Sequence, residues 1–218
     1  MKTIELRHTL PLVFQREQGT GAKVLSDVWL KDVTFETGKL YLIEASSGTG
    51  KSSLCSYIFG YRRDYEGQIL FDGRDISTFS TAELVRTRRE NISMLWQDLR
   101  LFPELTAMEN VEIKNNLTHH QSRTQIDQWF ELLGIADRKD YKIGRMSFGQ
   151  QQRVAMIRAL CQPFSFLFAD EPISHLDDEN SRVMADIMMA EAHRQGAGVI
   201  VTSIGKHMDL AYDAVMKL

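Results

Sequence analysis

Apolar and polar residues alternate at short period along the first part of the chain. The stretches IELRHTLPLVF, from Ile4, and VLSDVWLKDVTFETG, from Val24, both show this mixture, and a turn signal, QGTG at 18–21, lies between them. Alternation with a period of two puts the apolar side chains on one face of a β-strand. The pattern therefore predicts strands of an antiparallel sheet at the N-terminal end.

Shorter and more continuously apolar runs follow. KLYLIEA (Lys39 to Ala45) enters a glycine-rich loop, and the SSLCSYIFG that follows carries apolar residues at helical spacing and ends at Gly60. This order predicts a strand, a loop and a helix. EGQILFDG, which is bounded by turn residues, and ISMLWQ (Ile92 to Gln97) are expected to form further strands.

The pattern becomes helical between about Leu99 and Leu160. TAMENVEIKNNL, SRTQIDQWFELLGI and GQQQRVAMIRAL each carry an apolar stripe beside charged residues. Beyond them, FSFLFAD and GVIVTS are apolar runs of the kind found in parallel strands covered on both faces, and the helical SRVMADIMMAEAHRQ separates them. This βαβ unit predicts an α/β fold with an all-helical insert before it.

Composition and charge narrow the class of protein. The chain has 218 residues, 43% of them hydrophobic, which is enough for one substantial core or for two small ones that share an interface. Its net charge of -3 does not favour nucleic acid as the main partner. The longest dense apolar stretch, Phe164 to Ala169, is far shorter than the roughly 20 residues of a membrane-spanning helix.

The chain ends and the cysteines point to a cytoplasmic protein. The N-terminus, MKTIELRH, is too polar for a secretory signal. Cys55 and Cys161 lie far apart and show no spacing typical of a metal site or a disulfide framework, which fits a reducing compartment. If the protein works at a membrane, we expect another chain to anchor it.

The glycine-rich loop is a candidate phosphate site. ASSGTGKSS matches the end of the pattern G-x-x-x-x-G-K-[ST], with Ala45 where the first glycine is expected. Small residues leave backbone N–H groups free to bind phosphate, and the next helix adds its positive dipole end. Lys51 is expected to reach the β- and γ-phosphates of ATP, and Ser52 to give its hydroxyl to Mg²⁺. The alternative is a chance match in a Gly/Ser loop. The candidate ATP-binding residues are Ser46, Ser47, Gly48, Thr49, Gly50, Lys51, Ser52 and Ser53.

An acidic pair follows a predicted buried strand. LFADEP places Asp170 and Glu171 at the carboxyl end of that strand, where side chains of an open α/β sheet emerge toward a ligand. Asp170 is expected to hold Mg²⁺ and Glu171 to orient and deprotonate the attacking water. A solvated turn is the alternative, but the phosphate loop upstream favours the functional assignment.

MSFGQQQRVAMIRAL, from Met146 to Leu160, identifies a family. It resembles the L-S-G-G-Q signature of ABC ATPases and the helix that follows it, and Gln97 and SHLD, from Ser174 to Asp177, resemble the Q-loop and the D-loop of the same family. With the phosphate loop and the acidic pair, five motifs stand in the family's order. The FPELTAMENVEI stretch looks most like cassettes that serve lipoprotein-release, macrolide-export and cell-division permeases.

The resemblance covers the whole chain and implies its fold. That fold is a P-loop NTPase core of the RecA-like type, with an N-terminal antiparallel β subdomain and an inserted α-helical subdomain. One cassette would span residues 1–218, with residues 1–97 and 161–218 as the α/β core with the antiparallel sheet, and residues 98–160 as the helical subdomain that carries the signature.

The resemblance also implies a head-to-tail dimer of two identical cassettes, with each ATP between the phosphate loop of one chain and the signature of the other. Ser147 and Gly149 would meet the γ-phosphate across that interface. Gln97 would sense Mg²⁺ and the attacking water. The signature residues are Ser147, Phe148, Gly149 and Gln150, the D-loop residues are Ser174 and Asp177, and the metal-site residues are Ser52, Gln97 and Asp170.

Phe14 stands about where the family has an aromatic residue that stacks on adenine. An aromatic residue that packs in the core is an equal alternative.

Three residues depart from the family's pattern. At Ala45 a methyl group would cost about 1 kcal/mol if a positive φ is needed there. Phe148 replaces the first signature glycine, and we expect its ring to point away from the nucleotide into the helical insert. Ser203 stands where the family has a switch-loop histidine that contacts the γ-phosphate. If that histidine contact stabilises charge in the transition state, its absence here is expected to slow turnover about a hundredfold or more. His207, four residues on, is a weak substitute.

The sequence thus predicts an Mg²⁺-dependent ATPase on the cytoplasmic face of a membrane, bound to a separate permease. LRLFPEL, from Leu99 to Leu105, offers apolar residues for a groove that takes a permease helix, unless these leucines pack inside the insert. Two alternatives stay open. One is an ATP-binding regulatory clamp with little hydrolysis, suggested by Ser203 and Ala45. The other is a soluble ABC protein that acts on nucleic acid or ribosomes, which the acidic charge and the lack of a coiled coil disfavour.

Overall fold

The computed structural model describes residues 1–14, 25–46 and 48–218, so the predicted turn at 18–21 lies outside the described residues. An antiparallel sheet of four strands stands at the N-terminal end, in the order β2-β1-β4-β5. Its strands are β1 (Thr3–Pro11), β2 (Asp32–Glu36), β4 (Tyr65–Phe71) and β5 (Arg74–Asp75). The predicted antiparallel sheet is therefore confirmed.

The two N-terminal strands are shorter than the sequence pattern suggested. After β1 ends at Pro11, residues 12–14 form a helical turn, and in the second predicted stretch only the part from Asp32 is a strand. Within β2, Val33 and Phe35 are buried and their neighbours are exposed. The alternating pattern thus predicts the strand correctly where one face packs on a core, and it predicts a strand wrongly where the chain turns before β2.

The second sheet is parallel and has the order β6-β7-β8-β3-β9. It consists of β3 (Leu40–Glu44), β6 (Ile92–Leu95), β7 (Phe166–Asp170), β8 (Gly198–Ser203) and β9 (Ala214–Lys217). The strands β7 and β8 pair in parallel and are joined by α7 (Asp178–Gln195), which confirms the predicted βαβ unit. The sequence patterns predicted β3, β6, β7 and β8 but missed β9.

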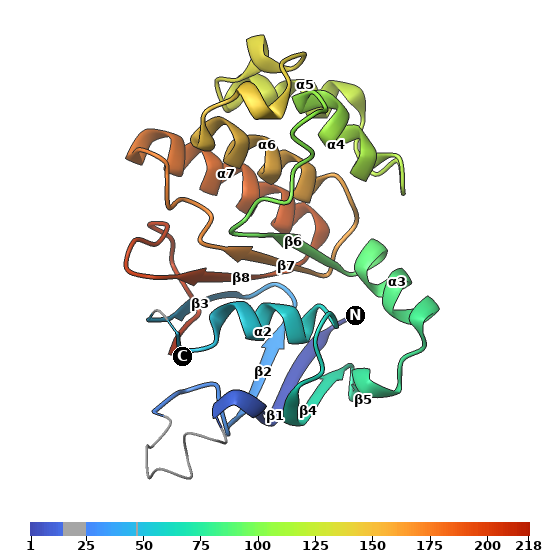
Figure 1. Cartoon of the computed structure of the whole chain (residues 1–218), viewed down its shortest axis with the longest axis vertical. Helices are drawn as coiled ribbons and strands as arrows, with labels where there is room; N and C mark the ends of the chain where they lie inside the picture. The colour runs from blue at the N-terminus through green and yellow to red at the C-terminus, as the bar shows by residue number, and fades with distance from the viewer. Residues whose placement is uncertain (15–24, 47) are drawn as a thin grey trace.

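Helices lie on both faces of the parallel sheet (Figure 1). On one side, α2 (Lys51–Ile58) lies between the two sheets, and on the other, α6 (Phe148–Leu160) and α7 cover the parallel strands. The described part of the chain also contains α3 (Thr81–Glu90), α4 (Ala107–Asn115) and α5 (Arg123–Leu132), and short 3₁₀ turns at Ile76–Thr78, Ala136–Arg138 and Ile143–Arg145. The predicted α/β fold with helices between residues 99 and 160 is confirmed.

Side chains of the parallel strands alternate between two hydrophobic cores. On β7, Leu167 and Ala169 pack with α4 to α7, whereas Phe166 and Phe168 pack with α2 and the antiparallel sheet. Because both faces are buried, the strand reads as a continuous apolar run. Met184 and Met188 of α7 are fully buried in the first core, so these methionines serve core packing.

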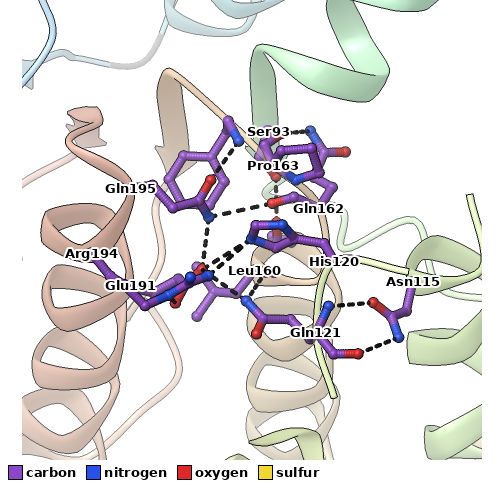
Figure 2. Close-up of polar contacts among 12 residues, drawn as sticks. Ser93, Asn115, His120, Gln121, Leu160, Gln162, Pro163, Glu191, Arg194 and Gln195 are labelled. Carbon is purple, nitrogen blue, oxygen red and sulfur yellow. Dashed lines mark hydrogen bonds and ion pairs between the residues drawn. The ribbon is translucent and has the colours of Figure 1, made fainter. Parts of the chain in front are cut away.

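A polar network joins the chain between α4 and α5 to the end of α7 (Figure 2). The buried Glu191 carboxylate accepts hydrogen bonds from Gln121 Nε2 at 2.8 Å, Gln195 Nε2 at 2.7 Å and Arg194 Nε at 2.8 Å. Burial acts to raise the pKa of Glu191, but the hydrogen bonds from Arg194, Gln195 and His120, together with the Arg194 charge, outweigh it and leave the pKa below its usual value. The network stabilises the helices around α5 against the rest of the molecule.

No helix in the described part of the chain combines the length and apolar character needed to cross a membrane. Cys55 and Cys161 are both free and buried. Burial raises the pKa of both thiols, so they stay protonated at neutral pH.

Candidate functional site

The loop between β3 and α2 has the backbone that a phosphate site needs. Gly48 and Gly50 have φ angles of 84° and 95°, and Gly50 is the residue from which α2 begins. A β-carbon at Gly50 would lie 3.1 Å from the rings of both Phe14 and Trp29. A side chain would therefore be both strained and crowded at this position, which explains why glycine stands there.

The expected cost at Ala45 does not arise. Ala45 is not among the residues with positive φ, and its N–H donates to the Ser203 carbonyl at 2.9 Å. This backbone conformation accepts any L-residue, so the missing glycine carries no strain here. The expectation of a strained alanine, which rested on the need for a positive φ, was wrong.

Lys51 and the acidic pair meet at the start of α2. The Lys51 ammonium is ion-paired with Glu171 and lies 3.1 Å from Asp170 Oδ1. All three side chains are mostly shielded from solvent, with exposed fractions of 6%, 13% and 4% for Lys51, Glu171 and Asp170. Buried charges persist only when they are paired, and here two elements far apart in sequence supply the partners.

The two acids are held differently. Asp170 Oδ1 accepts a hydrogen bond from Thr202 Oγ1 at 2.5 Å, which fixes this carboxylate at the end of β7. Glu171 has a φ of 49°, unusual for a residue with a side chain, and its N–H donates to the Thr202 carbonyl at 3.0 Å. Surrounding contacts must hold such a backbone in place.

The residues expected to hold magnesium share one cavity. Ser52, Gln97 and Asp170 line a cavity of about 270 Å³, together with Trp96 and Arg100. A hydroxyl, an amide carbonyl and a carboxylate are hard oxygen ligands of the kind Mg²⁺ takes, and Mg²⁺ usually keeps several waters and needs few protein ligands. The donor set therefore fits the ion.

Other predicted residues of the phosphate loop have local roles. Thr49 Oγ1 donates to the Ser46 carbonyl at 2.9 Å, and Ser53 Oγ accepts from Arg62 at 3.1 Å. Ser47 lies outside the described residues. The Phe14 ring lies against Gly50, beside the loop, so stacking on adenine stays a prediction.

The signature begins α6. Ser147 is the N-cap of this helix, and its side chain and that of Gln150 exchange hydrogen bonds with each other's backbone N–H. This capping box leaves the N–H groups of the first turn, including that of Gly149, at a positive helix end. Because α6 and α2 cover opposite faces of the parallel sheet, one chain presents signature and phosphate loop on separate elements (Figure 1).

Phe148 does not point into the helical insert, and that prediction was wrong. Its ring lies 4.4 Å from the His175 ring, centroid to centroid, and 42% of the residue is exposed. The reason is that the loop after Glu171 passes over the first turn of α6, where the side chain at position 148 emerges. This contact joins the signature to the D-loop of the same chain.

The D-loop residues serve the backbone around Glu171. The Ser174 hydroxyl donates to the Glu171 carbonyl at 3.3 Å, and Asp177 caps α7 by accepting from Asn180 N at 2.8 Å. That backbone hydrogen bond from Asn180 lowers the pKa of Asp177. The loop is therefore tied down at both ends.

Ser203 and His207 lie close to the site without contacting its charged groups. Ser203 is 2% exposed, and its hydroxyl donates to the Lys206 carbonyl at 2.5 Å. His207 contacts the Met208 carbonyl through Nδ1 at 3.1 Å, and its ring lies beside Tyr212. In this conformation the Ser203 hydroxyl is already engaged, and a role for it at the γ-phosphate stays a prediction.

Sequence patterns missed residues that act through the backbone. Trp29 Nε1 donates to the Thr49 carbonyl at 2.9 Å, which ties the antiparallel sheet to the phosphate loop. Gln152 Nε2 donates to the Glu171 carbonyl at 3.1 Å. Trp29 lies in no motif, so no sequence signal marked it, whereas Gln152 belongs to the helix after the signature.

Comparisons with known proteins agree with this geometry. The family model described as ABC transporter matches residues 30–174. An uncharacterized ABC transporter ATP-binding protein of Bacillus subtilis (strain 168), YvrO, is 35% identical over 174 residues, which are 78% of this chain and 75% of that protein. The macrolide export ATP-binding/permease protein MacB of Shewanella sp. (strain W3-18-1) is 32% identical over 194 residues, 87% of this chain. The chain spans only 30% of that relative's length.

Solved structures show the same fold. The dimeric bacterial ABC transporter cassette MJ0796 superposes with a TM-score of 0.75 at 24% identity, covering 92% of this chain and 87% of the cassette. The same cassette in a post-hydrolysis state, bound to ADP and Pi, gives a TM-score of 0.72 at 25% identity with the same coverage. The motif order, the fold and these relatives lead to one conclusion: the chain belongs to the ABC transporter family, as one of its ATP-binding cassettes.

Proposed function

We propose that this chain is the ATP-hydrolysing subunit of an ABC transporter or a related membrane complex. The observation that carries the proposal is the convergence of Lys51, Asp170 and Glu171 at the start of α2. A lysine and two acids that approach a glycine-rich loop are the groups that phosphoryl transfer requires.

We also propose that the cassette has two subdomains. Residues 1–97 and 161–218 form the α/β core with the antiparallel sheet, and residues 98–160 form the helical part with the signature.

Each residue has a distinct part in hydrolysis. Lys51 exchanges its carboxylate partners for the β- and γ-phosphates when ATP binds. Ser52, Gln97 and Asp170 hold Mg²⁺, which when bound neutralises negative charge on the phosphates. Glu171 takes a proton from water while the water oxygen bonds to the γ-phosphorus and the bond from that phosphorus to the β,γ-bridging oxygen breaks. The products are ADP and inorganic phosphate.

A second copy of the chain completes the site. We propose a head-to-tail homodimer in which Ser147 and the Gly149 N–H of one protomer reach the γ-phosphate bound by its partner. The support is that α6 and α2 lie on opposite faces of the parallel sheet, and that a helix N-terminus such as that of α6 binds anions.

The permease is the proposed third component, with the cassette on the cytoplasmic face of the membrane. The apolar stretch from Leu99 to Leu105 supports this only in part, because Leu99 is 3% exposed and belongs to the core, whereas Phe102 is 52% exposed. A cavity of about 220 Å³ opens nearby, lined by Tyr61, Trp96 and residues of α4. Its wall combines aromatic rings with the cationic side chains of Arg88, Arg100, Lys114 and Arg158, so it suits a partner helix that presents both apolar and acidic residues. The net charge of -3 gives no support to a nucleic-acid partner.

One observation favours the alternative of a regulatory clamp that binds ATP with little turnover. The Ser203 hydroxyl donates to Lys206 and offers no free donor in this conformation. Serine also lacks the reach and the positive charge of a histidine. The clamp would share the dimer and the ATP site but not the turnover.

The deciding experiment compares Mg·ATP hydrolysis by the purified chain with that of Glu171→Gln, together with the molecular mass of both in ATP. Turnover that disappears in the variant, with an ATP-dependent dimer, supports the proposed ATPase. ATP binding and dimerisation without turnover in the unmodified chain would favour the regulatory clamp. Failure to bind ATP would contradict both.

A further inference from the structure

Phe148 and His175 form an exposed aromatic contact between two motifs of one chain. Phe148 is the first residue of α6, and its ring plane is tilted by 59° from that of His175 at a centroid separation of 4.4 Å. A β-carbon at the next residue, Gly149, would come within 3.1 Å of the His175 carbonyl oxygen. The first turn of α6 therefore lies directly on the loop that follows Glu171.

The same loop holds the backbone of Glu171. His175 Nδ1 lies 2.9 Å from Ser174 Oγ, and the Ser174 hydroxyl donates to the Glu171 carbonyl at 3.3 Å. Gln152, one turn further along α6, donates to that carbonyl at 3.1 Å. Two routes thus connect α6 with Glu171: one runs through Gln152, and the other runs through the ring contact of Phe148 and the loop.

Contacts to this backbone are effective because the conformation of Glu171 is unfavourable by itself. Its φ of 49° lies in the left-handed region, which a residue with a side chain adopts only when its surroundings hold it there. The direction of the carboxylate follows from this backbone. A looser loop would therefore displace the group that accepts the proton from water.

We propose that Phe148 and His175 are positioning residues, whose ring contact holds residues 174–176 against α6 and so keeps the Glu171 carboxylate of the same chain aligned for hydrolysis. This inference rests on the proposed dimeric ATPase. The α6 N-terminus of each chain faces the ATP bound by its partner, while its own Glu171 serves its own ATP.

The first test measures kcat and KM for Phe148→Ala, His175→Ala and the double variant. Loss of one aromatic contact is expected to lower kcat about threefold to tenfold while KM for ATP changes by less than about twofold. The double variant should be no slower than the slower single variant, because both remove the same contact. Phe148→Tyr keeps the ring and should restore kcat, and Tyr141→Ala, an exposed aromatic of the helical insert, is the matched control.

A second test separates this role from a direct effect of the signature on the partner's ATP. Heterodimers are purified through two different tags, with Glu171→Gln in one chain so that the other performs all hydrolysis. We expect Phe148→Ala to lower kcat when it is in the hydrolysing chain and to have little effect when it is in the Glu171→Gln chain. The reverse pattern would overturn the inference, because the signature of the Glu171→Gln chain is the one that faces the hydrolysed ATP.

Turnover and ATP-dependent dimerisation of the unmodified chain show whether a negative result bears on the proposed function or on the positioning role alone. If it shows neither turnover nor an ATP-dependent dimer, the proposed function fails and the inference fails with it. If it shows both and Phe148→Ala matches it in kcat, only the positioning role is overturned.

Discussion

At the scale of single residues, the loop around Gly50 depends on side chains that no motif contains. Trp29 is 1% exposed, and its indole N–H donates to the Thr49 carbonyl. A buried tryptophan normally needs such a partner, and here the partner is the phosphate loop itself. The bond orients the Thr49–Gly50 peptide, whose one N–H group, that of Gly50, is expected to face phosphate. We therefore expect Trp29 to affect nucleotide binding through the loop and not by direct contact.

We predict that Trp29→Phe weakens Mg·ATP binding about threefold to tenfold, because one hydrogen bond that orders the loop is worth about 1 kcal/mol. Isothermal titration calorimetry measures the Kd directly. Trp129→Phe is the matched control, since Trp129 is also buried but lies on α5. Equal values of Kd for the two variants would show that the Trp29 bond does not order the loop.

At the scale of elements, α3 shows how a helix can form without an apolar stripe. None of its residues is buried, but Ser80 and Glu83 form a capping box at its N-terminus. The Glu83 carboxylate also accepts from Arg74 at 2.7 Å. The hydrogen bond from Arg74 is the main reason that the pKa of Glu83 falls to about 2, and the capping bonds from Ser80 add to it.

This lowered pKa predicts a dependence of stability on pH. A carboxyl group whose pKa is lower in the folded state stabilises the fold above its ordinary pKa, near 4.5, and this stabilisation is lost as the pH falls toward 2. We expect the free energy of unfolding to decrease less steeply between pH 5 and about 2.5 in Glu83→Gln than in the unmodified chain. Denaturant titrations at several pH values measure it. Glu104→Gln is the control, because its ion pair with Lys142 is 3.9 Å long, and an identical slope in both variants would contradict the prediction.

Helix α3 also illustrates which elements of the fold can be predicted from patterns in the sequence and which cannot. Strands β7 and β8 were predictable because burial on both faces makes them continuous apolar runs, and helices α5 and α6 because burial of one face gives their apolar residues a helical period. Helix α3 has no buried residue, so periodicity gave no signal, and only the S-x-x-E spacing from Ser80 to Glu83 could have marked it. Strand β9 was missed because alternate residues are only partly buried over four positions.

For the candidate site, a different factor limits what the sequence can predict. The loop, the acids and the signature were predictable because each needs particular residue types close together in sequence. The contacts of Trp29 with Thr49, and of Phe148 with His175, join residues 20 and more positions apart. They depend on how elements pack, which no local pattern encodes. The conformation of Ala45 likewise followed from its strand pairing and not from the motif.

At the scale of the whole molecule, the site joins both sheets. The phosphate loop follows a central parallel strand, Trp29 reaches it from the side of the antiparallel sheet, and Glu171 and Gln97 follow β7 and β6. Bound nucleotide would therefore be linked to both sheets, directly through the parallel strands and indirectly through Trp29. A ligand that binds only the folded state stabilises all of it, and the gain grows with the logarithm of ligand concentration over Kd.

We predict that Mg·ATP at about 100 times its Kd stabilises Glu171→Gln by about 2.7 kcal/mol and raises its Tm by about 5 to 10 °C. This variant is used because it does not consume the ligand. Removing Mg²⁺ with EDTA should cancel most of the shift if Ser52, Gln97 and Asp170 hold the ion. In the double variant Lys51→Met, Glu171→Gln the shift should disappear, each Tm being compared with that of the same variant without ATP.

If the dimer forms as proposed, the Tm in Mg·ATP also rises with protein concentration, whereas a monomer that binds ATP gives a Tm shift that does not depend on protein concentration. Scanning calorimetry over a tenfold range of concentration separates the two.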